Sequence, residues 1–576
     1  MKVLLSGNEA VARGAYEAGC NIATAYPGTP STEILENLRK YKDIYVEWAT
    51  NEKVAFEVAV GASFAGARTL VAMKHVGLNV AADPLFTVSY EGVNGGFIVV
   101  SADDPGMWSS QNEQDNRWYA LMAKIPMLEP SDSQETKDLI KLGFDISEEF
   151  DTPLLFRMTT RICHSSTPVT LEDKINHPIK GYVPNVSKFL CLPSNARRWH
   201  PIVENRLLKL QAYNEQLNKN LMEINDTSIG IITSGISYQY AKEVFPDASF
   251  LKLSMTYPLP IKLIKEFAGK VKKIYVIEEN DPFLENNIKI LGIQVTGKDK
   301  IPICGELTQA VLRKSFDIST PKPTELTVKI PKRPPVLCPG CPHRGAFYTI
   351  NKLKLHAMGD IGCYTLGAFP PLNALETCVC MGASISNAYG IERASIPEDK
   401  TKLVAVIGDS TFFHTGVPAL INLVYNNGCT TVLILDNLIT AMTGHQQHPG
   451  TGQTAREEPA RKVSIEELVK GCGVKRVFIV DPYNLDELKT ILKREIAIPE
   501  PSVIIARRDC VLRIKPQFVM KVNNDVCTGC KLCINLGCPA LTLKDNKAYI
   551  DPILCTGCGL CQQVCVKKSI SQEPKC

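Results

Sequence analysis

Short apolar runs alternate with segments rich in Ala and Gly over roughly the first 170 residues. The runs Tyr45–Ala49, Thr69–Met73 and Gly96–Ser101 have the length of strands, and Val54–Ala67 has the length and composition of a helix. A repeated strand–helix alternation is typical of a mostly parallel, doubly wound sheet. The pattern therefore predicts an α/β fold for this part of the chain.

The rest of the chain divides further. A polar stretch from about 180 to 225 indicates a linker and then a helix. The strand-like runs Ser228–Thr233, Ser249–Leu253 and Lys273–Glu278 indicate a smaller α/β unit. A run of prolines from Pro321 to Pro335 excludes a helix and predicts an extended linker. At about 150 residues per domain, 576 residues suggest about four domains. We expect boundaries of 1–175, 176–330, 331–520 and 521–576.

Composition narrows the class of protein only slightly. Apolar residues make up 45% and charged residues 22%, as is ordinary for a globular protein, and a net charge of +4 gives no reason to expect nucleic acid. The N-terminus does not read as a signal peptide, and no apolar run approaches the roughly 18–20 residues of a membrane span. Many cysteines without an export signal favour a reducing compartment. We therefore expect a cytoplasmic protein with thiolates that bind metal.

Eight of the 21 cysteines form two similar motifs between residues 527 and 565. A C-x2-C-x2-C run can hold three corners of an iron–sulfur cube, and in two-cluster ferredoxins the fourth cysteine of each run reaches the other cluster. Zinc sites usually use two CxxC pairs instead, so we favour two [4Fe–4S] clusters over zinc or disulfides. The predicted ligands are Cys527, Cys530, Cys533 and Cys565 for one cluster, and Cys538, Cys555, Cys558 and Cys561 for the other.

A second chemical signature lies in the third predicted domain. The apolar strand Lys402–Ile407 ends in Gly408-Asp409-Ser410, a helix is expected from about 416 to 427, and the next strand, Thr431–Leu435, ends in Asp436-Asn437. A glycine at a strand end lets backbone N–H groups approach a diphosphate. Asp409 and Asn437 carry hard oxygen ligands that suit Mg²⁺. An ordinary turn with an N-capping Asp is the alternative reading.

This segment resembles the thiamine-diphosphate motif, a GD(G/S) followed by an Asn 25–30 residues later. The resemblance implies that the backbone carbonyl of Ile439 completes the metal shell and that Ser410 and Thr440 line the cofactor site. It also implies a glutamate in another domain, at the start of a helix rich in small residues, which hydrogen-bonds to the cofactor's pyrimidine ring. Glu52 fits this place, and Glu47 on the preceding strand is the rival.

Further motifs cover nearly the full length. They are Tyr26-Pro27-Gly28-Thr29-Pro30-Ser31, Met73-Lys74-His75-Val76-Gly77, the segment from Asp104 to Arg117, Cys338-Pro339-Gly340-Cys341-Pro342-His343-Arg344-Gly345 and Ala441-Met442-Thr443-Gly444-His445. Together they resemble the 2-oxoacid:ferredoxin oxidoreductases, and the domain order is similar to that of the large (alpha) subunits that act on arylpyruvates. The resemblance implies thiamine-diphosphate-binding doubly wound domains, a transketolase C-terminal-like domain and a terminal α+β module of the two-[4Fe–4S] ferredoxin type.

The same resemblance implies the chemistry. We expect oxidative decarboxylation of arylpyruvates such as indole-3-pyruvate with coenzyme A, to aryl-acetyl-CoA and CO2, with electrons passed to ferredoxin. A branched-chain or small 2-oxoacid is the alternative substrate. Thr29 and Arg117 are the expected substrate contacts, and His75 and His414 are candidate proton carriers or else structural histidines. A non-oxidative thiamine decarboxylase would lack the terminal clusters, and a pure electron-transfer protein would lack the thiamine motif.

Two further expectations concern a third cluster and a partner. C-P-G-C binds a proximal cluster in several relatives, which implies Cys338, Cys341, Cys363 and, as fourth ligand, Cys510. Cys378 and Cys380 compete for that last place, and a proline-stiffened turn with reduced cysteines is the alternative. Relatives also pair this subunit with a smaller beta subunit, so we expect a heterodimer or heterotetramer.

Overall fold

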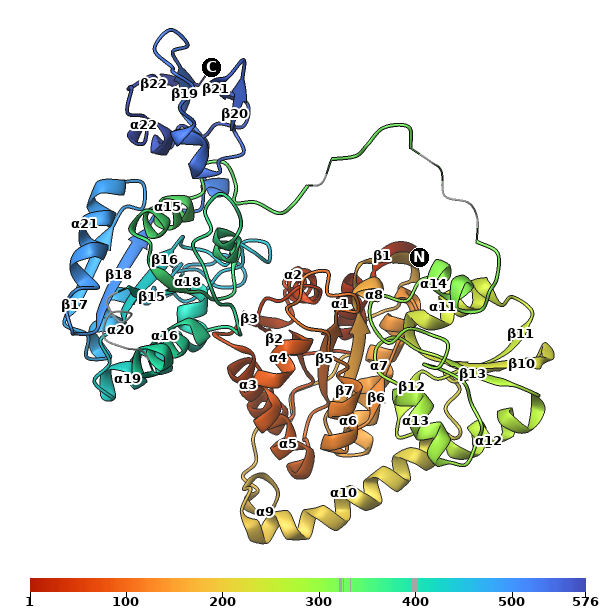
Figure 1. Ribbon diagram of the computed structural model, residues 1–576. Helices are drawn as coiled ribbons and strands as arrows, with labels where there is room; N and C mark the ends of the chain where they lie inside the picture. The colour runs from red at the N-terminus through yellow and green to blue at the C-terminus, as the bar shows by residue number, and fades with distance from the viewer. Residues whose placement is uncertain (321–323, 325, 332, 395–401, 576) are drawn as a thin grey trace. The chain divides into compact units, whose positions relative to one another are not determined.

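The computed structural model describes residues 1–320, 324, 326–331, 333–394 and 402–575. The chain forms two compact units, Met1–Leu326 and Thr327–Cys576 (Figure 1). The division falls close to the expected boundary at 330, while the other expected boundaries remain predictions. Pro321 and Pro323 of the expected linker lie outside the described residues. Among the described residues, no helix combines the length and the apolar character that crossing a membrane requires.

A seven-stranded sheet, in the order β12-β6-β7-β5-β4-β2-β3, forms the centre of the first unit. All its neighbours pair in parallel except the edge strand β12. The mostly parallel sheet expected from the alternating pattern is therefore confirmed. Its strands are β2 (Ile22–Ala25), β3 (Tyr45–Trp48), β4 (Thr69–Lys74), β5 (Phe97–Asp103), β6 (Met127–Leu128), β7 (Leu154–Thr159) and β12 (Met255–Tyr257).

Helices pack around this sheet on both sides (Figure 1). The longer ones are α1 (Gly7–Glu17), α3 (Glu52–Phe64), α5 (Ala82–Glu91) and α7 (Ser133–Glu149). Helix α3 begins with the side chain of its N-cap, Asn51, which accepts a hydrogen bond from Val54 N. A separate antiparallel pair joins β1 (Lys2–Ser6) to β8 (Ser166–Thr170).

A second, four-stranded sheet in the order β13-β10-β11-β9 follows the long helix α10 (Pro193–Asn214), which is the helix expected after the polar linker. The three strands predicted here are present and parallel. They are β10 (Asp226–Thr233), β11 (Ala248–Lys252) and β13 (Ile274–Ile277), with β9 (Leu221–Glu223) antiparallel at the edge and helices α11 (Gly235–Val244), α12 (Ile261–Lys270), α13 (Phe283–Ile290) and α14 (Gln309–Ser315) around them.

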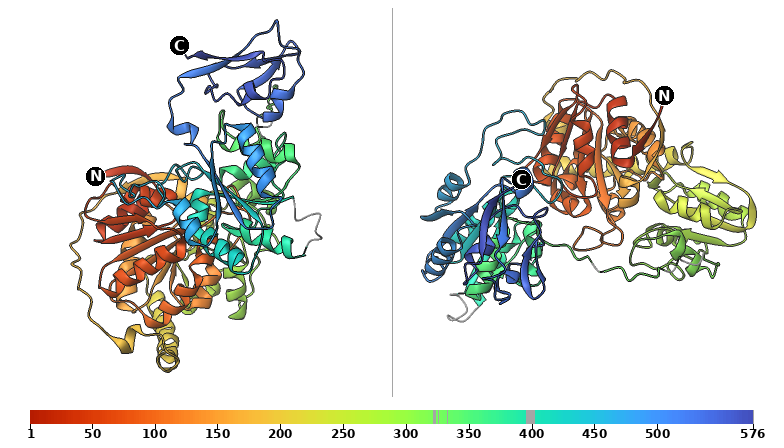
Figure 2. Two further views of the ribbon diagram at one scale, coloured as in Figure 1. Left: turned by 90° about the vertical axis from the view of Figure 1, so that its left-hand side faces the viewer. Right: turned by 90° about the horizontal axis from the view of Figure 1, so that it is seen from above.

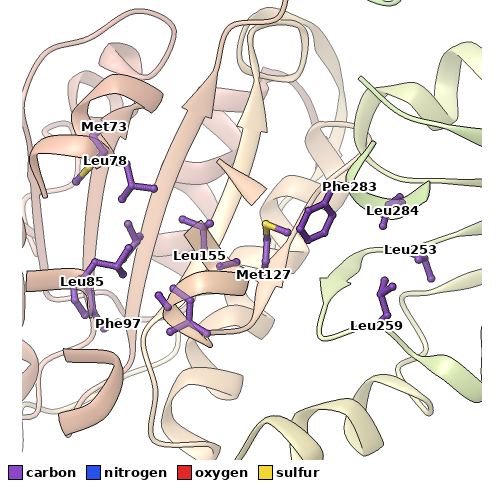
Figure 3. Packing of buried hydrophobic residues seen from close by; sticks show 14 of the residues in the cluster. Met73, Leu78, Leu85, Phe97, Met127, Leu155, Leu253, Leu259, Phe283 and Leu284 are labelled. Atoms are coloured by element: carbon purple, nitrogen blue, oxygen red, sulfur yellow. The ribbon is translucent and has the colours of Figure 1, made fainter. Parts of the chain in front are cut away.

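One hydrophobic core joins the two sheets of the first unit. Met127 and Leu155 of the larger sheet belong to the same buried cluster as Leu253 and Phe283 (Figure 3). A buried ion pair adds to this contact, because Arg117 Nη1 lies 2.5 Å from Glu278 Oε2. The guanidinium also donates to Asp115 Oδ1 at 2.8 Å and to the Glu279 carbonyl at 2.9 Å. Arg117 therefore fastens the second α/β region to the first.

The second unit contains a five-stranded parallel sheet in the order β14-β15-β16-β18-β17. Alternate residues of β15 belong to different cores: Val404 and Val406 pack with Phe347 on one face, and Ala405 and Ile407 with Leu420 on the other. The sheet is therefore doubly wound (Figure 2). Its strands are β14 (His356–Met358), β15 (Leu403–Gly408), β16 (Thr431–Asp436), β17 (Arg476–Val480) and β18 (Ser502–Arg507). Helices α15 (His343–Leu353) and α21 (Leu485–Glu495) cover one face, and α16 (Ala383–Ala394), α19 (Val417–Tyr425) and α20 (Ile465–Gly471) cover the other.

The helix after β15 starts earlier than the sequence indicates. Helical geometry begins at Asp409 in α18 (Asp409–Thr411), widens into a π turn, η2 (Phe412–Gly416), and continues as α19. Pro418 has no N–H with which to bond the carbonyl four residues earlier, and a widened turn accommodates that loss. Asp409 is consequently the first residue of a helix rather than part of a loop.

Residues 518–574 form a small lobe at one end of the second unit (Figure 2). Strand β19 (Phe518–Val522) pairs with β22 (Ile570–Pro574), and β20 (Leu541–Lys544) pairs with β21 (Lys547–Ile550), both antiparallel. Short helices, η4 (Leu532–Leu536) and α22 (Leu560–Gln563), stand between the strands in each half. The strand–helix–strand order therefore occurs twice, as the two cysteine motifs do.

Replacing Arg117 by Met should destabilise the protein by about 3–5 kcal/mol, because the carboxylates of Asp115 and Glu278 would stay buried without their partner. Lys53→Met removes an exposed ion pair with Glu57 and should cost less than about 1 kcal/mol. Denaturant unfolding of both variants measures the difference. Equal midpoints for the two variants would show that the buried pair does not stabilise the fold.

Candidate functional site

The carboxyl ends of β15 and β16 place two polar side chains next to each other. The strands pair in parallel with Gly408 opposite Leu435, so Asp409 and Asn437 follow at the same edge of the sheet. Both are buried, with exposed fractions of 3% and 6%. Parallel α/β sheets bind their ligands at this edge. The two residues predicted to hold Mg²⁺ therefore lie in a position suited to a ligand.

The Asn437 amide lies against two acceptor oxygens. One of the two terminal atoms of the amide, its nitrogen or its oxygen, lies 2.8 Å from the Ile439 carbonyl oxygen and 3.3 Å from Asp409 Oδ2. With the amide nitrogen in this place, both contacts are hydrogen bonds. With the amide oxygen there, three oxygens meet without a proton between them, an arrangement that requires a cation. The donor set of Asp409, Asn437 and Ile439 thus fits a hard divalent ion such as Mg²⁺.

A histidine that the sequence reasoning missed completes this group. His448 Nε2 lies 3.1 Å from Asp409 Oδ2, and His448 is itself buried. Burial opposes ionisation of Asp409, but the charge and hydrogen bond of His448 outweigh it and lower the pKa of that carboxyl. The sequence shows two histidines three residues apart, His445 and His448. Only the fold shows that His448 is the one that contacts Asp409.

Gly408, Ser410, Thr440 and His414 surround these ligands. A side chain on Gly408 would come within 2.6 Å of the Tyr364 ring, so only glycine fits there. Thr440 Oγ1 donates to Ser410 Oγ at 2.9 Å, which joins the turns after β15 and β16. His414 is buried in the π turn, with Nδ1 3.1 Å from Thr415 Oγ1. Gly408, Ser410 and Thr440 lie at the same carboxyl edge of the sheet as Asp409 and Asn437, and His414 lies about one turn further along the helix.

Glu52 lies in the first unit, at the first position of α3, and is only 5% exposed. A Cβ atom on Gly77 would lie 2.7 Å from Glu52 Oε1, so glycine at that position leaves room for the carboxylate. The rival, Glu47, is partly exposed on β3 and accepts a hydrogen bond from Tyr45 Oη at 2.8 Å. Burial at a helix start favours Glu52 for the role in the cofactor site.

His75 and Thr29 lie near a loop of residues 109–112. His75 is fully buried, its Nε2 is 3.3 Å from the Asn112 carbonyl, and burial lowers its pKa to about 4, so it is neutral at pH 7. Ser109 Oγ donates to the Thr29 carbonyl at 3.4 Å. Lys74, which the sequence reasoning did not single out, donates to the Ser109 carbonyl at 2.6 Å, and burial lowers its pKa to about 8.

Arg117, which was expected to contact the substrate, is instead buried among acidic side chains and main-chain carbonyls. Its guanidinium is 1% exposed, and all of its nitrogens donate to Asp115, Glu278 and the carbonyls of residues 279 and 281. Each nitrogen already has an acidic or carbonyl partner, so the role that the structure gives Arg117 is to join the two α/β regions. Glu278 and the two carbonyls lie more than 160 residues away along the chain, where no local motif could indicate them.

Four cysteines lie close to one another near Asp409. Burial, and then the charges of Cys510 and Cys338, raise the pKa of Cys363 to about 11. Burial likewise raises the pKa of Cys341 to about 12, with Cys338 and Cys363 among its neighbours. Cys378 and Cys380 interact with Asp360 instead. The fold therefore brings Cys510, rather than either rival, to Cys338, Cys341 and Cys363.

The terminal lobe holds its eight cysteines in two groups. Cys527, Cys530 and Cys533 line one cavity together with Cys565, and Cys555, Cys558 and Cys561 line another together with Cys538. The fourth cysteine of each motif has thus crossed to the other group. In the part of the chain that the structure describes, no three His, Cys, Asp or Glu side chains close on one metal ion.

Comparison with known proteins finds two thiamine-diphosphate-binding segments, one in each unit of the chain. Residues 360–506 match the model of the thiamine pyrophosphate enzyme C-terminal TPP binding domain, and residues 13–187 match that of the thiamine-diphosphate-binding domain of pyruvate flavodoxin/ferredoxin oxidoreductases. The two matched segments contain Asp409 with Asn437 and Glu52, respectively.

Three curated relatives match nearly the whole chain, and each is an indolepyruvate oxidoreductase subunit IorA. The protein of Archaeoglobus fulgidus is 43% identical over 99% of this chain and 97% of its own length. The relative from Pyrococcus horikoshii is 41% identical over 98% and 96%, and that from Methanothermobacter thermautotrophicus is 38% identical over 100% and 98%. The chain therefore belongs to the family of indolepyruvate oxidoreductase IorA subunits, thiamine-pyrophosphate-dependent oxidoreductases of 2-oxoacids.

Proposed function

We propose that this subunit catalyses the oxidative decarboxylation of arylpyruvates, with indole-3-pyruvate as the type substrate, to aryl-acetyl-CoA and CO2. Its electrons leave through [4Fe–4S] clusters to ferredoxin, and a smaller beta subunit completes the enzyme. The observation that carries the proposal is the hydrogen bond from Cys510 N–H to the Asn437 carbonyl at 3.1 Å. This contact supports a cysteine site next to the proposed metal and diphosphate site, because it joins Cys510 directly to Asn437.

Different residues would bind the metal ion, the cofactor and the substrate. Asp409, Asn437 and the Ile439 carbonyl would hold Mg²⁺ and, through it, the diphosphate, with Ser410 and Thr440 at the same edge. Glu52 would hold a proton at the pyrimidine ring. When bound, thiamine diphosphate supplies a nucleophilic carbon and an electron sink for the decarboxylation. Thr29 would contact the substrate carboxylate, and His75, which its lowered pKa keeps neutral at pH 7, would act there through hydrogen bonds rather than as a base.

The cysteines would carry the electrons away in three steps. The group of Cys338, Cys341, Cys363 and Cys510 lies nearest to the metal site, since the charge of Asp409 acts on the thiols of Cys363 and Cys510. The C-P-G-C loop then touches the terminal lobe, because a Cβ on Gly340 would come within 1.9 Å of Thr556 Oγ1. Thr556 lies between Cys555 and Cys558. Three clusters in this order would form a continuous path.

The direct test is an anaerobic assay of the chain co-expressed with its smaller subunit. Indole-3-pyruvate, phenylpyruvate, branched-chain 2-oxoacids and pyruvate are supplied with coenzyme A and a viologen dye. The proposal predicts the highest kcat/KM for the arylpyruvates and strict dependence on coenzyme A. Preference for a branched-chain or small 2-oxoacid would support the oxidative decarboxylation but contradict the assignment of arylpyruvates as substrates. Decarboxylation without dye reduction would refute the oxidative reaction.

Asp409→Ala should reduce the affinity for thiamine diphosphate and Mg²⁺ by about 100-fold or more, because it removes a direct ligand. The exposed acid Asp486, in the same unit, provides the matched control Asp486→Ala, which should bind normally. Cofactor content of the purified proteins measures the effect, and the iron content of both should equal the wild type. Full cofactor retention in Asp409→Ala would remove Asp409 from the metal site.

Glu52→Gln should lower kcat by about 10²–10⁴-fold while the cofactor still binds, because an amide of the same shape cannot relay the proton. Glu47→Gln serves as the control, and we expect little change in its rate. Steady-state kinetics with saturating thiamine diphosphate compare the two. If Glu47→Gln were the inactive variant, the assignment of the two glutamates would be reversed.

Cys338→Ser/Cys341→Ser should lose about four irons per chain, one cube, and keep the irons of the terminal lobe. The control Cys378→Ser/Cys380→Ser alters the rival pair and should keep the full iron content. Iron and sulfide analysis of anaerobically purified protein measures both. An unchanged iron content in the first variant would make C-P-G-C a structural turn.

A further inference from the structure

Arg344 is a buried cation without a carboxylate partner. It is the second residue of α15, immediately after the C-P-G-C loop, and its side chain is 1% exposed. Nη1 donates to the Leu536 carbonyl at 2.7 Å, and Nη2 donates to the carbonyls of Leu337 and Cys338 at 2.7 and 3.0 Å. Nε has no partner.

No ion pair balances this charge within the residues that the structure describes: every hydrogen bond of Arg344 goes to a main-chain carbonyl. Arg117, which is also only 1% exposed, has two carboxylates within 2.5 Å. Burying an unpaired charge costs several kcal/mol. An anion bound in the cavity beside Arg344 would offset that cost.

The surroundings indicate which anion. Arg344 lines the same cavity as Cys538, Cys555, Cys558 and Cys561, and the remaining wall is mostly apolar, with Met520, Leu541 and Ile550 among its residues. The other side of Arg344 contacts the C-P-G-C loop, because Nη2 donates to the Cys338 carbonyl at 3.0 Å. The guanidinium therefore lies between two groups of cysteines, one in the C-P-G-C loop and one in the terminal lobe.

The other cavity of the terminal lobe has no such cation. The residues around Cys527, Cys530, Cys533 and Cys565 include Lys531 and Lys567, and both lysines are exposed. Water and salt screen an exposed charge strongly, whereas a buried charge acts at low dielectric. The two proposed terminal clusters therefore differ mainly in the buried charge beside one of them.

We propose that Arg344 is the counter-ion of the cluster held by Cys538, Cys555, Cys558 and Cys561, and that its charge raises the reduction potential of this cluster above that of the outer one. The inference rests on the proposed function, in which these cysteines hold a [4Fe–4S] cube. When bound, such a cube would accept one electron without forming or breaking a bond and would gain one negative charge. The guanidinium of Arg344 would stabilise that added charge.

Arg344 is on this account a positioning residue that acts through the cluster. It makes the inner terminal cluster the preferred acceptor of electrons from the C-P-G-C site, since that cluster lies next to the loop and holds the extra electron more stably. The outer cluster then receives electrons in a second step and presents them to ferredoxin.

The test is a potentiometric titration of the anaerobically purified full chain, followed by EPR, with iron content measured on every sample. Arg344→Gln removes the charge, Arg344→Lys keeps it, and Lys567→Gln removes an exposed charge beside the outer cavity. A Cys558→Ser variant identifies the signal of the inner cluster. Arg344→Gln should shift that midpoint to a lower potential and leave the midpoint of the outer cluster unchanged, while Arg344→Lys and Lys567→Gln should produce much smaller shifts of the inner-cluster midpoint.

Three results would overturn the proposal. One is an unchanged inner-cluster midpoint in Arg344→Gln with full iron content. Another is an equal shift in Arg344→Lys, because hydrogen bonding rather than charge would then set the potential. If Arg344→Gln failed to hold the cluster, Arg344→Lys would decide: full iron at the wild-type midpoint supports the charge, and equal iron loss contradicts it. Wild-type protein without any iron–sulfur signal would instead refute the proposed function itself.

Discussion

Parallel pairing of the five strands in the second unit is the constraint on which the proposed chemistry depends. Parallel strands end at one edge of the sheet. Four of the strands are followed within five residues by a group that the proposal uses, and β17 is followed by Tyr483, which contacts the C-P-G-C loop. Main-chain hydrogen bonds fix the register of the strands, and this register brings the groups that follow the strands to the same edge. They are Cys363 after β14, Asp409 after β15, Asn437 after β16, Tyr483 after β17 and Cys510 after β18.

Two consequences follow for electron transfer. The Cys510 N–H bonds to the Asn437 carbonyl, so a proposed cluster ligand and a proposed metal ligand share one main-chain contact. On the other side, the Tyr483 hydroxyl donates to the Gly340 carbonyl, and burial together with the charge of Cys558 raises the pKa of that phenol. The sheet edge thus reaches from the diphosphate site to the terminal lobe through short local contacts, and Arg344 adds a buried charge where the last two cysteine groups meet.

Short sequence patterns predicted the features that depend on residues close together in the chain. The strands around Gly408 and Asn437, the helix that Glu52 opens and the crossing of Cys538 and Cys565 all depend on spacings within a few tens of residues. What depends on distant partners was not predictable: the role of Arg117 is set by Glu278, and the choice of Cys510 over Cys378 is set by strand order. Arg344 stood in a recognised motif, but only its burial beside Leu536, 192 residues later, shows its unpaired charge.

The central claim is that 2-oxoacid oxidation and cluster reduction are coupled in this subunit. Freeze-quench EPR tests it most directly, on the enzyme with its smaller subunit, mixed anaerobically with indole-3-pyruvate and coenzyme A but without ferredoxin. The account predicts that the signal of reduced [4Fe–4S] clusters appears with CO2 release and is absent in Glu52→Gln. Release of CO2 while the clusters stay oxidised would contradict it.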